Sequence, residues 1–109
     1  MSQVTAITTD RFHEQVIQSP VPVLVDFYAD WCPPCRALAP ILDTLAQQVD
    51  GEARIVKVNV DHEPALAQRY GINSIPTLLV FAGGREVDRI AGLLSPEQLR
   101  RKLVRAEAA

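Results

Sequence analysis

The sequence predicts an α/β fold in which a central mixed five-stranded sheet is flanked by four helices, in the order β-α-β-α-β-α-β-β-α. Three observations predict it. The 109 residues are 48% hydrophobic and 22% charged, as in an ordinary globular domain, so we treat residues 1–109 as a single domain. Apolar runs alternate with amphipathic stretches, and helices that connect strands imply parallel neighbours. Finally, Gly83-Gly84 separates two strand-like runs, which indicates a tight hairpin and an antiparallel edge.

The first three elements are a short strand over residues 4–7, a helix over residues 10–18 and a strand over residues 21–29. Apolar residues recur at the helical period in the helix, and either Thr9 or Asp10 is suited to cap it. The second strand is almost wholly apolar, which is typical of a strand buried on both faces.

A long helix follows. It is expected to begin at Pro34, because a proline disfavours helical geometry in the residue before it, and to extend to about Val49, with Gly51 ending it. Pro40 lies inside this helix and has no N–H for the Arg36 carbonyl, so we expect a kink there.

The second half of the chain predicts a strand over residues 53–60, in which valines alternate with polar residues. Asp61 is placed to cap a short helix that ends at Tyr70-Gly71. Residues 77–82 and 85–91 are the two strands of the hairpin.

The last helix opens at Ser95, with Pro96 at its first position and Gln98 three residues after the cap, which is the pattern of a capping box. Its candidate core residues are Leu99, Leu103 and Val104.

Charge and hydropathy exclude some classes of partner. The formal net charge of −2 does not suggest nucleic acid, and no apolar run reaches the length of a membrane span. Residues 1–5 show no basic segment before an apolar stretch, so we expect no signal peptide and a cytoplasmic location.

We interpret a basic cluster near the C-terminus as a solvated helix face, and we expect a monomer. The cluster consists of Arg100, Arg101, Lys102 and Arg105.

The candidate site is Trp31-Cys32-Pro33-Pro34-Cys35, which lies between the buried strand and the long helix. Free N–H groups and the partial positive charge of a helix N-terminus favour thiolate over thiol. We therefore expect Cys32 to be the more exposed nucleophile. Cys35, one turn inward, is then the resolving thiol that releases the product from a mixed disulfide.

Three other interpretations of the cysteines stay open, namely a zinc site, two inert buried thiols and a purely structural disulfide. Zinc needs four ligands, and the two histidines, His13 and His62, form no local pair with the cysteines. Inert thiols do not need the start of a helix, and a chain of this size in a reducing compartment has little need of a structural disulfide. The pattern favours a redox pair.

These residues resemble the thioredoxin family. The resemblance covers nearly the whole chain and lies in VDFYADWCPPC at residues 25–35, in Pro40, in Ile75-Pro76-Thr77 and in Gly92. It implies the thioredoxin fold and a protein-disulfide reductase, a general electron donor that works through a reversible Cys32–Cys35 dithiol/disulfide. It implies no bound cofactor or metal, with electrons supplied from NADPH through thioredoxin reductase. Expected substrates are disulfide-containing proteins such as ribonucleotide reductase, peroxiredoxins and methionine sulfoxide reductase.

Asp26 interrupts the apolar run of the second strand. Burial disfavours the charged carboxylate, so its pKa should rise. It could also be a satisfied carboxyl paired with Lys57 on the neighbouring strand. The resemblance implies that Asp26 assists proton transfer at Cys35 and that Lys57 modulates it.

Residues around the cysteines are candidates for binding an extended polypeptide through backbone contacts and an apolar surface. The resemblance implies a cis Ile75–Pro76 peptide packed against the cysteines, and Gly92 would allow close backbone approach. The candidate substrate-binding residues are Trp31, Pro34, Ile75, Pro76, Ala91 and Gly92.

The chain departs from the family at Pro33, where glycine is usual, so that WCPPC replaces WCGPC. Tyr28 replaces a common tryptophan and Arg36 a common lysine. Pro33 leaves the Cys35 N–H as the nearest backbone donor to the thiolate, but its rigidity could equally strain the disulfide, so the sign of its effect on redox potential stays open. A disulfide oxidase or isomerase with a shifted potential, or a non-catalytic binding or chaperone-like module, is therefore the alternative function.

Overall fold

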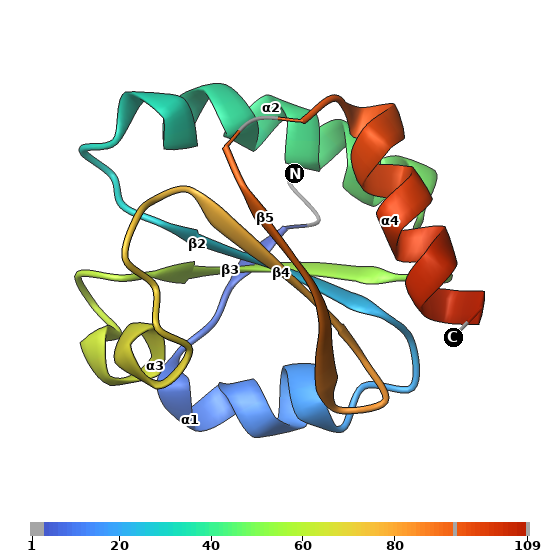
Figure 1. Cartoon of the computed structure of the whole chain (residues 1–109), viewed down its shortest axis with the longest axis horizontal. Helices are drawn as coiled ribbons and strands as arrows, with labels where there is room; N and C mark the ends of the chain where they lie inside the picture. The colour runs from blue at the N-terminus through green and yellow to red at the C-terminus, as the bar shows by residue number, and fades with distance from the viewer. Residues whose placement is uncertain (1–3, 93, 109) are drawn as a thin grey trace.

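The computed structural model describes residues 4–92 and 94–108, and it confirms the predicted fold class and element order (Figure 1). Residues 1–3, part of the segment in which an export signal would begin, lie outside the described residues. The strands are β1 (Thr5–Ala6), β2 (Val23–Tyr28), β3 (Arg54–Asn59), β4 (Thr77–Ala82) and β5 (Arg85–Ala91). The helices are α1 (Thr9–Phe12), extended by a π-helical turn over His13–Ile17, then α2 (Pro33–Gln48), α3 (Pro64–Arg69) and α4 (Pro96–Ala108).

The five strands form one mixed sheet in the order β1-β3-β2-β4-β5. The strands β1, β3 and β2 are parallel, whereas β4 is antiparallel to both of its neighbours, as the predicted hairpin requires. Gly83 and Gly84 make that hairpin turn with φ of 60° and 81°, conformations that glycine adopts without steric cost. The apolar strand β2 lies in the middle of the sheet, which explains why both of its faces are buried.

Helices cover both faces of the sheet, with α2 and α4 on one face and α1 and α3 on the other (Figure 1). Side chains alternate along β2, so that Leu24 joins the core under α2 while Val23, Val25 and Phe27 join the opposite core. Each fully buried leucine or phenylalanine contributes about 1.5–3 kcal/mol, so these two cores hold the ends of β2 and α2 in place. The leucines of the α2–α4 core are Leu24, Leu38, Leu42, Leu45, Leu78, Leu99 and Leu103.

Several helix starts differ from the prediction. The N-cap of α1 is Thr8, not Thr9 or Asp10, and the N–H of Thr9 instead donates to the Glu63 carboxylate at 2.8 Å. Asp61 does not cap α3, because that helix begins at Pro64 after Glu63. In both cases a carboxylate or hydroxyl suited to capping is used for another contact, which local sequence does not reveal.

The long helix begins one residue before the predicted start, at Pro33. Two prolines are tolerated there because the first helical positions have no intrahelical use for an N–H. The helix continues through Pro40 to Gln48, and Gly51 follows with φ of 82°. In α4, Leu99 and Leu103 are buried as predicted, but Val104 is 53% exposed and lies outside the core, so the prediction for Val104 is wrong.

The basic cluster on α4 is partly paired. Arg101 forms an ion pair with Glu97, and Lys102 forms one with Asp88, both at 2.9 Å. In the described ranges, no helix has the length and apolar character needed to cross a membrane.

The capping box of α4 is formed as predicted, since the Gln98 N–H donates to Ser95 Oγ at 3.2 Å and the Ser95 N–H donates to Gln98 Oε1 at 2.9 Å. Replacing Ser95 with alanine removes one of these bonds. We expect the free energy of unfolding to fall by about 0.5–2 kcal/mol, measured by urea titration. Ser95→Asp keeps a capping acceptor and serves as the control, and an equal loss in both variants would contradict the capping role.

Candidate active site

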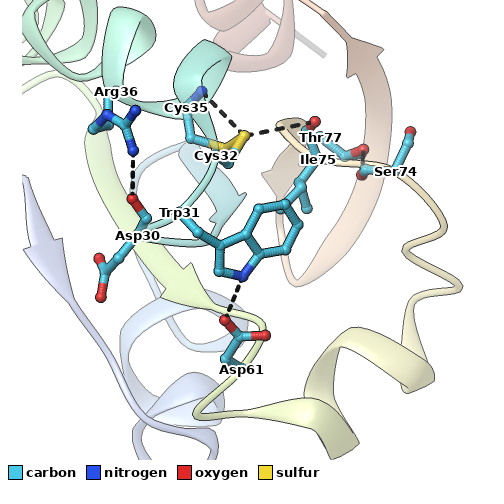
Figure 2. The surroundings of a disulfide bond; sticks show 9 residues. All are labelled: Asp30, Trp31, Cys32, Cys35, Arg36, Asp61, Ser74, Ile75 and Thr77. Carbon is cyan, nitrogen blue, oxygen red and sulfur yellow. Dashed lines mark hydrogen bonds between the residues drawn. A yellow bond between two sulfur atoms is a disulfide. The ribbon is translucent and has the colours of Figure 1, made fainter.

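The two cysteines lie where the chain passes from β2 into α2, and they are joined in a disulfide (Figure 2). Cys32 is the N-cap of α2, and its Sγ accepts a hydrogen bond of 3.3 Å from the Cys35 N–H. The Cα atoms of the pair are 5.2 Å apart. The predicted setting at a helix N-terminus is thus confirmed, and Cys35 N–H is the donor that the sequence singled out.

Both cysteines are covered in the disulfide form. Their exposed fractions are 3% for Cys32 and 5% for Cys35, so the expectation that Cys32 is the more exposed of the two is wrong for this state. Ile75 covers the pair, and its carbonyl oxygen lies 3.9 Å from Cys32 Sγ.

The peptide bond between Ile75 and Pro76 is cis, as the family resemblance implied. Pro76 is buried and Ile75 is half-buried, while the Thr77 hydroxyl donates to the Ser74 carbonyl at 2.6 Å and fixes the turn before β4. Figure 2 shows Ile75 and Cys32 facing each other across this short gap.

Trp31 directly precedes Cys32, and 65% of its surface is exposed beside the disulfide. Its indole N–H donates to Asp61 Oδ2 at 2.8 Å (Figure 2). Sequence reasoning missed this contact, because Asp61 was assigned to a helix cap. The remaining substrate-binding candidates, Pro34, Ala91 and Gly92, are exposed, and Gly92 has φ of 91°.

Asp26 is buried and lines the same cavity as Cys35. Strand alternation and parallel register place Asp26 opposite Lys57, and both on the face of the sheet that α2 covers. Only 3% of Asp26 is exposed, and its Oδ1 has no hydrogen-bond partner among the described residues. Burial raises the pKa of Asp26 to about 7, although the positive charge of Lys57 acts to lower it.

Lys57 does not form the ion pair with Asp26 that the sequence suggested, since the two are not joined by any salt bridge within 4.0 Å in residues 4–92. Its Nζ lies 5.1 Å from the centre of the Tyr28 ring, a cation–π contact that competes for the ammonium. The influence of Lys57 on Asp26 is Coulombic and acts to lower the Asp26 pKa.

Asp26, Lys57 and Cys35 line one cavity of about 440 Å³ between the sheet and the start of α2. Arg36 lies at the same cavity, and its guanidinium donates to the Asp30 carbonyl at 2.9 Å. The cavity thus brings the buried Asp26 carboxyl and the Cys35 residue of the disulfide to one space. In the described part of the chain, no group of three or more His, Cys, Asp or Glu side chains could hold a metal ion.

Comparison with known proteins decides the family. The thioredoxin family model matches residues 3–105. The chain belongs to the thioredoxin family. It is 48% identical to thioredoxin 1 of Nostoc sp. over 94% of this chain and 96% of that protein. It is also 49% identical to thioredoxin 1 of Synechococcus elongatus, over 84% and 86% of the two chains, and 41% identical to a thioredoxin of Rickettsia bellii, over 80% and 83%.

As a thioredoxin, the chain is a thiol–disulfide oxidoreductase, and Cys32–Cys35 is its redox pair. It is a disulfide reductase of the thioredoxin type. Both cysteines are joined in the disulfide, so neither is a zinc ligand or an inert free thiol in this structure. Few residues are needed to build the redox site in this fold. The end of β2, the start of α2 and the turn at Pro76 supply them.

Proposed function

We propose that Cys32 attacks the substrate and that Cys35 resolves the intermediate. The thiolate of Cys32 attacks one sulfur of a substrate disulfide, forming a mixed disulfide and releasing the other sulfur as a thiolate. The Cys35 thiolate then attacks Cys32, which breaks the mixed disulfide and releases the reduced substrate, so two electrons pass to the substrate. The observation that supports this order is the N-cap position of Cys32, whose sulfur receives the Cys35 N–H at 3.3 Å.

Asp26 is proposed to accept the proton that Cys35 must lose before it attacks. A group with a pKa of about 7 is well matched to this task near neutral pH, and it lines the same cavity as the Cys35 side chain. Lys57 is proposed to modulate Asp26, since its charge opposes the rise in the Asp26 pKa. No other carboxyl is among the buried residues described.

A substrate segment is proposed to bind in extended form across the face that contains the disulfide. Ile75 would offer its backbone to the substrate, beside the exposed indole of Trp31. Backbone contacts do not depend on side-chain identity, which suits a reductase with many protein substrates. The proposed surface comprises Trp31, Pro34, Ile75, Pro76, Ala91 and Gly92.

We further propose the setting in which the chain works. Residues 1–109 form one thioredoxin domain, a monomer that binds no cofactor and receives electrons from NADPH through thioredoxin reductase. Its substrates are disulfide proteins such as ribonucleotide reductase, peroxiredoxins and methionine sulfoxide reductase. A thiol reductant fits a reducing compartment, the cytoplasm. The match to the thioredoxin family model over residues 3–105 supports the assignment of a single thioredoxin domain.

The WCPPC variant is proposed to have little effect on the Cys32 thiolate. An N-cap side chain accepts from the second or third helical residue, and here the third, Cys35, supplies the bond, so proline at the first position removes no donor that the cap uses. Pro33→Gly is therefore expected to leave the alkylation rate of the Cys32 thiol in the reduced protein within about twofold of the original. It should lower the free energy of unfolding by about 1 kcal/mol, because glycine gives the unfolded chain more freedom.

The rate of thiol alkylation at neutral pH and urea unfolding measure these two effects of Pro33→Gly. An alkylation rate that changes by more than about twofold would show that Pro33 controls the thiolate by another route. Pro40→Ala, in the same helix but away from the sulfurs, is the control for general changes in α2.

The function is tested by reduction of insulin disulfides, run with NADPH and with or without thioredoxin reductase. We expect turnover only when the reductase is present, and none with the variant in which both Cys32 and Cys35 are replaced by serine. A double-serine variant that retained full biological activity would instead support a non-catalytic binding module.

A further inference from the structure

Asn59 is a buried polar residue that the proposed reaction does not use. It is the last residue of β3, and only 6% of it is exposed. Buried side-chain amides are found where their hydrogen bonds are satisfied, because an unpaired amide costs about 1–3 kcal/mol. The partners of this amide therefore indicate what it does.

The Asn59 amide has partners in two segments, the loop after β3 and the end of β2 with the residues that follow it. The Tyr28 side chain at the end of β2 is also hydrogen-bonded to it. The Asn59 Oδ1 accepts from the Asp61 N–H at 2.9 Å and from the His62 N–H at 3.3 Å. Its Nδ2 donates to Asp30 Oδ2 at 3.5 Å, and Asp30 directly precedes Trp31. One side chain thus connects the loop after β3 with the segment that leads into the redox pair.

Asp61, in the loop that Asn59 holds, is also the hydrogen-bond partner of Trp31. The indole N–H donates to Asp61 Oδ2 at 2.8 Å, as Figure 2 shows, while 65% of the tryptophan surface is exposed. A side chain that is so exposed has little packing to fix its rotamer, so its orientation depends on this hydrogen bond. The hydrogen bond in turn requires that the loop containing Asp61 stays where Asn59 holds it.

We propose that Asn59 is a positioning residue for protein substrates, which fixes the Asp61 loop and, through Asp61, the indole of Trp31 beside the Cys32–Cys35 disulfide. The proposal rests on the docking role given to Trp31 in the proposed function. The hydrogen bonds described for Asn59 lead to Tyr28, Asp30, Asp61 and His62 and not to a sulfur, so we expect its effect on substrate docking rather than on thiol chemistry.

The first experiment measures Trp31 directly. It is the only tryptophan in the sequence, so intrinsic fluorescence reports its environment alone. We expect Asn59→Ala and Asp61→Ala to shift the emission of the reduced protein in the same direction, and the double variant to add nothing further, because both act on one hydrogen bond.

The second experiment measures docking. With insulin as substrate, we expect Asn59→Ala to raise KM about threefold to tenfold, as for one lost hydrogen bond, with kcat within about twofold. Cystine is a small disulfide that we expect not to contact the Trp31 side chain. Its reduction rate should therefore stay within about twofold of the original. If Asn59→Ala does not fold in urea controls, Asn59→Leu, which has a similar size and no hydrogen-bonding group, replaces it.

Two results would overturn the proposal: an unchanged Trp31 emission in Asn59→Ala while Asp61→Ala shifts it, or effects that add fully in the double variant. Trp31→Ala separates this failure from a failure of the proposed function. An unchanged insulin KM in Trp31→Ala would reject the docking role of the tryptophan, while the emission experiment would still decide whether Asn59 positions it.

Discussion

Replacing Cys35 with serine is expected to stop turnover and to trap the protein on its substrate. Cys32 keeps its place at the N-cap of α2, so it still attacks a disulfide and forms the mixed disulfide. Without the second sulfur, no group within the chain breaks that bond. Insulin reduction should fall by at least about three orders of magnitude, and a covalent complex should appear on non-reducing gels.

Cys32→Ser is the matched control for this experiment. It should lose turnover to the same extent but form no covalent complex, because the attacking sulfur is absent. A covalent complex formed by Cys32→Ser and not by Cys35→Ser would reverse the proposed roles. The structure makes this a real test, since the exposed fractions of the two cysteines, 3% and 5%, do not distinguish them.

Asp26→Asn is expected to stabilise the protein above neutral pH and to slow disulfide exchange. The carboxyl has a pKa of about 7 in the folded protein against 3.8 when unperturbed. Between these values the folded state holds a proton that the unfolded state releases, so stability falls as pH rises from about 4 to about 7 and then levels off. One pKa unit corresponds to about 1.4 kcal/mol, so the original protein loses about 4 kcal/mol of unfolding free energy over this range. The variant has no carboxyl at this position and does not show this loss.

The pH dependence isolates this effect from the cost of burying an amide. That cost is the same at every pH, so the difference in unfolding free energy between Asp26→Asn and the original protein should grow by about 4 kcal/mol from pH 4 to pH 8. Urea titrations at the two pH values measure it. A pH-independent difference would mean that the carboxyl is not protonated in the fold.

The catalytic part of the same prediction is a slower second step. Without a proton acceptor beside Cys35, we expect disulfide exchange near neutral pH to slow about tenfold or more. Lys57→Met, which keeps the length of the side chain, should instead raise the Asp26 pKa further, because the positive charge that opposes the rise is lost. Exchange rates unchanged across neutral pH in Asp26→Asn would remove Asp26 from the mechanism.

Much of the fold was predictable because its signals are local. The strands over residues 77–82 and 85–91 and the Ser95 capping box depend on neighbours within a few residues, and the structure confirms them. The burial of Asp26 was also predictable from sequence, because the residues on both sides of it are apolar and form a strand that is covered on both faces.

The rest of the site depends on contacts between distant segments. Asp61 and Asn59 were missed as site residues because their partners, Trp31 and Asp30, are about 30 residues away, and local rules offer a helix cap as the simpler use of an aspartate. Lys57 was placed on the right strand, yet the Tyr28 ring, which lies across the strand pair, competes with Asp26 for its ammonium. Periodicity places a side chain on a face but does not choose its partner.

The central claim is that Cys32–Cys35 is a reversible pair that gives electrons to substrates. Equilibration with a glutathione redox buffer, followed by alkylation of free thiols, measures it most directly. We expect a potential near that typical of thioredoxins, about −270 mV, so that the pair reduces ordinary protein disulfides. A potential near about −120 mV, as in enzymes that form disulfides, would contradict the reductase account.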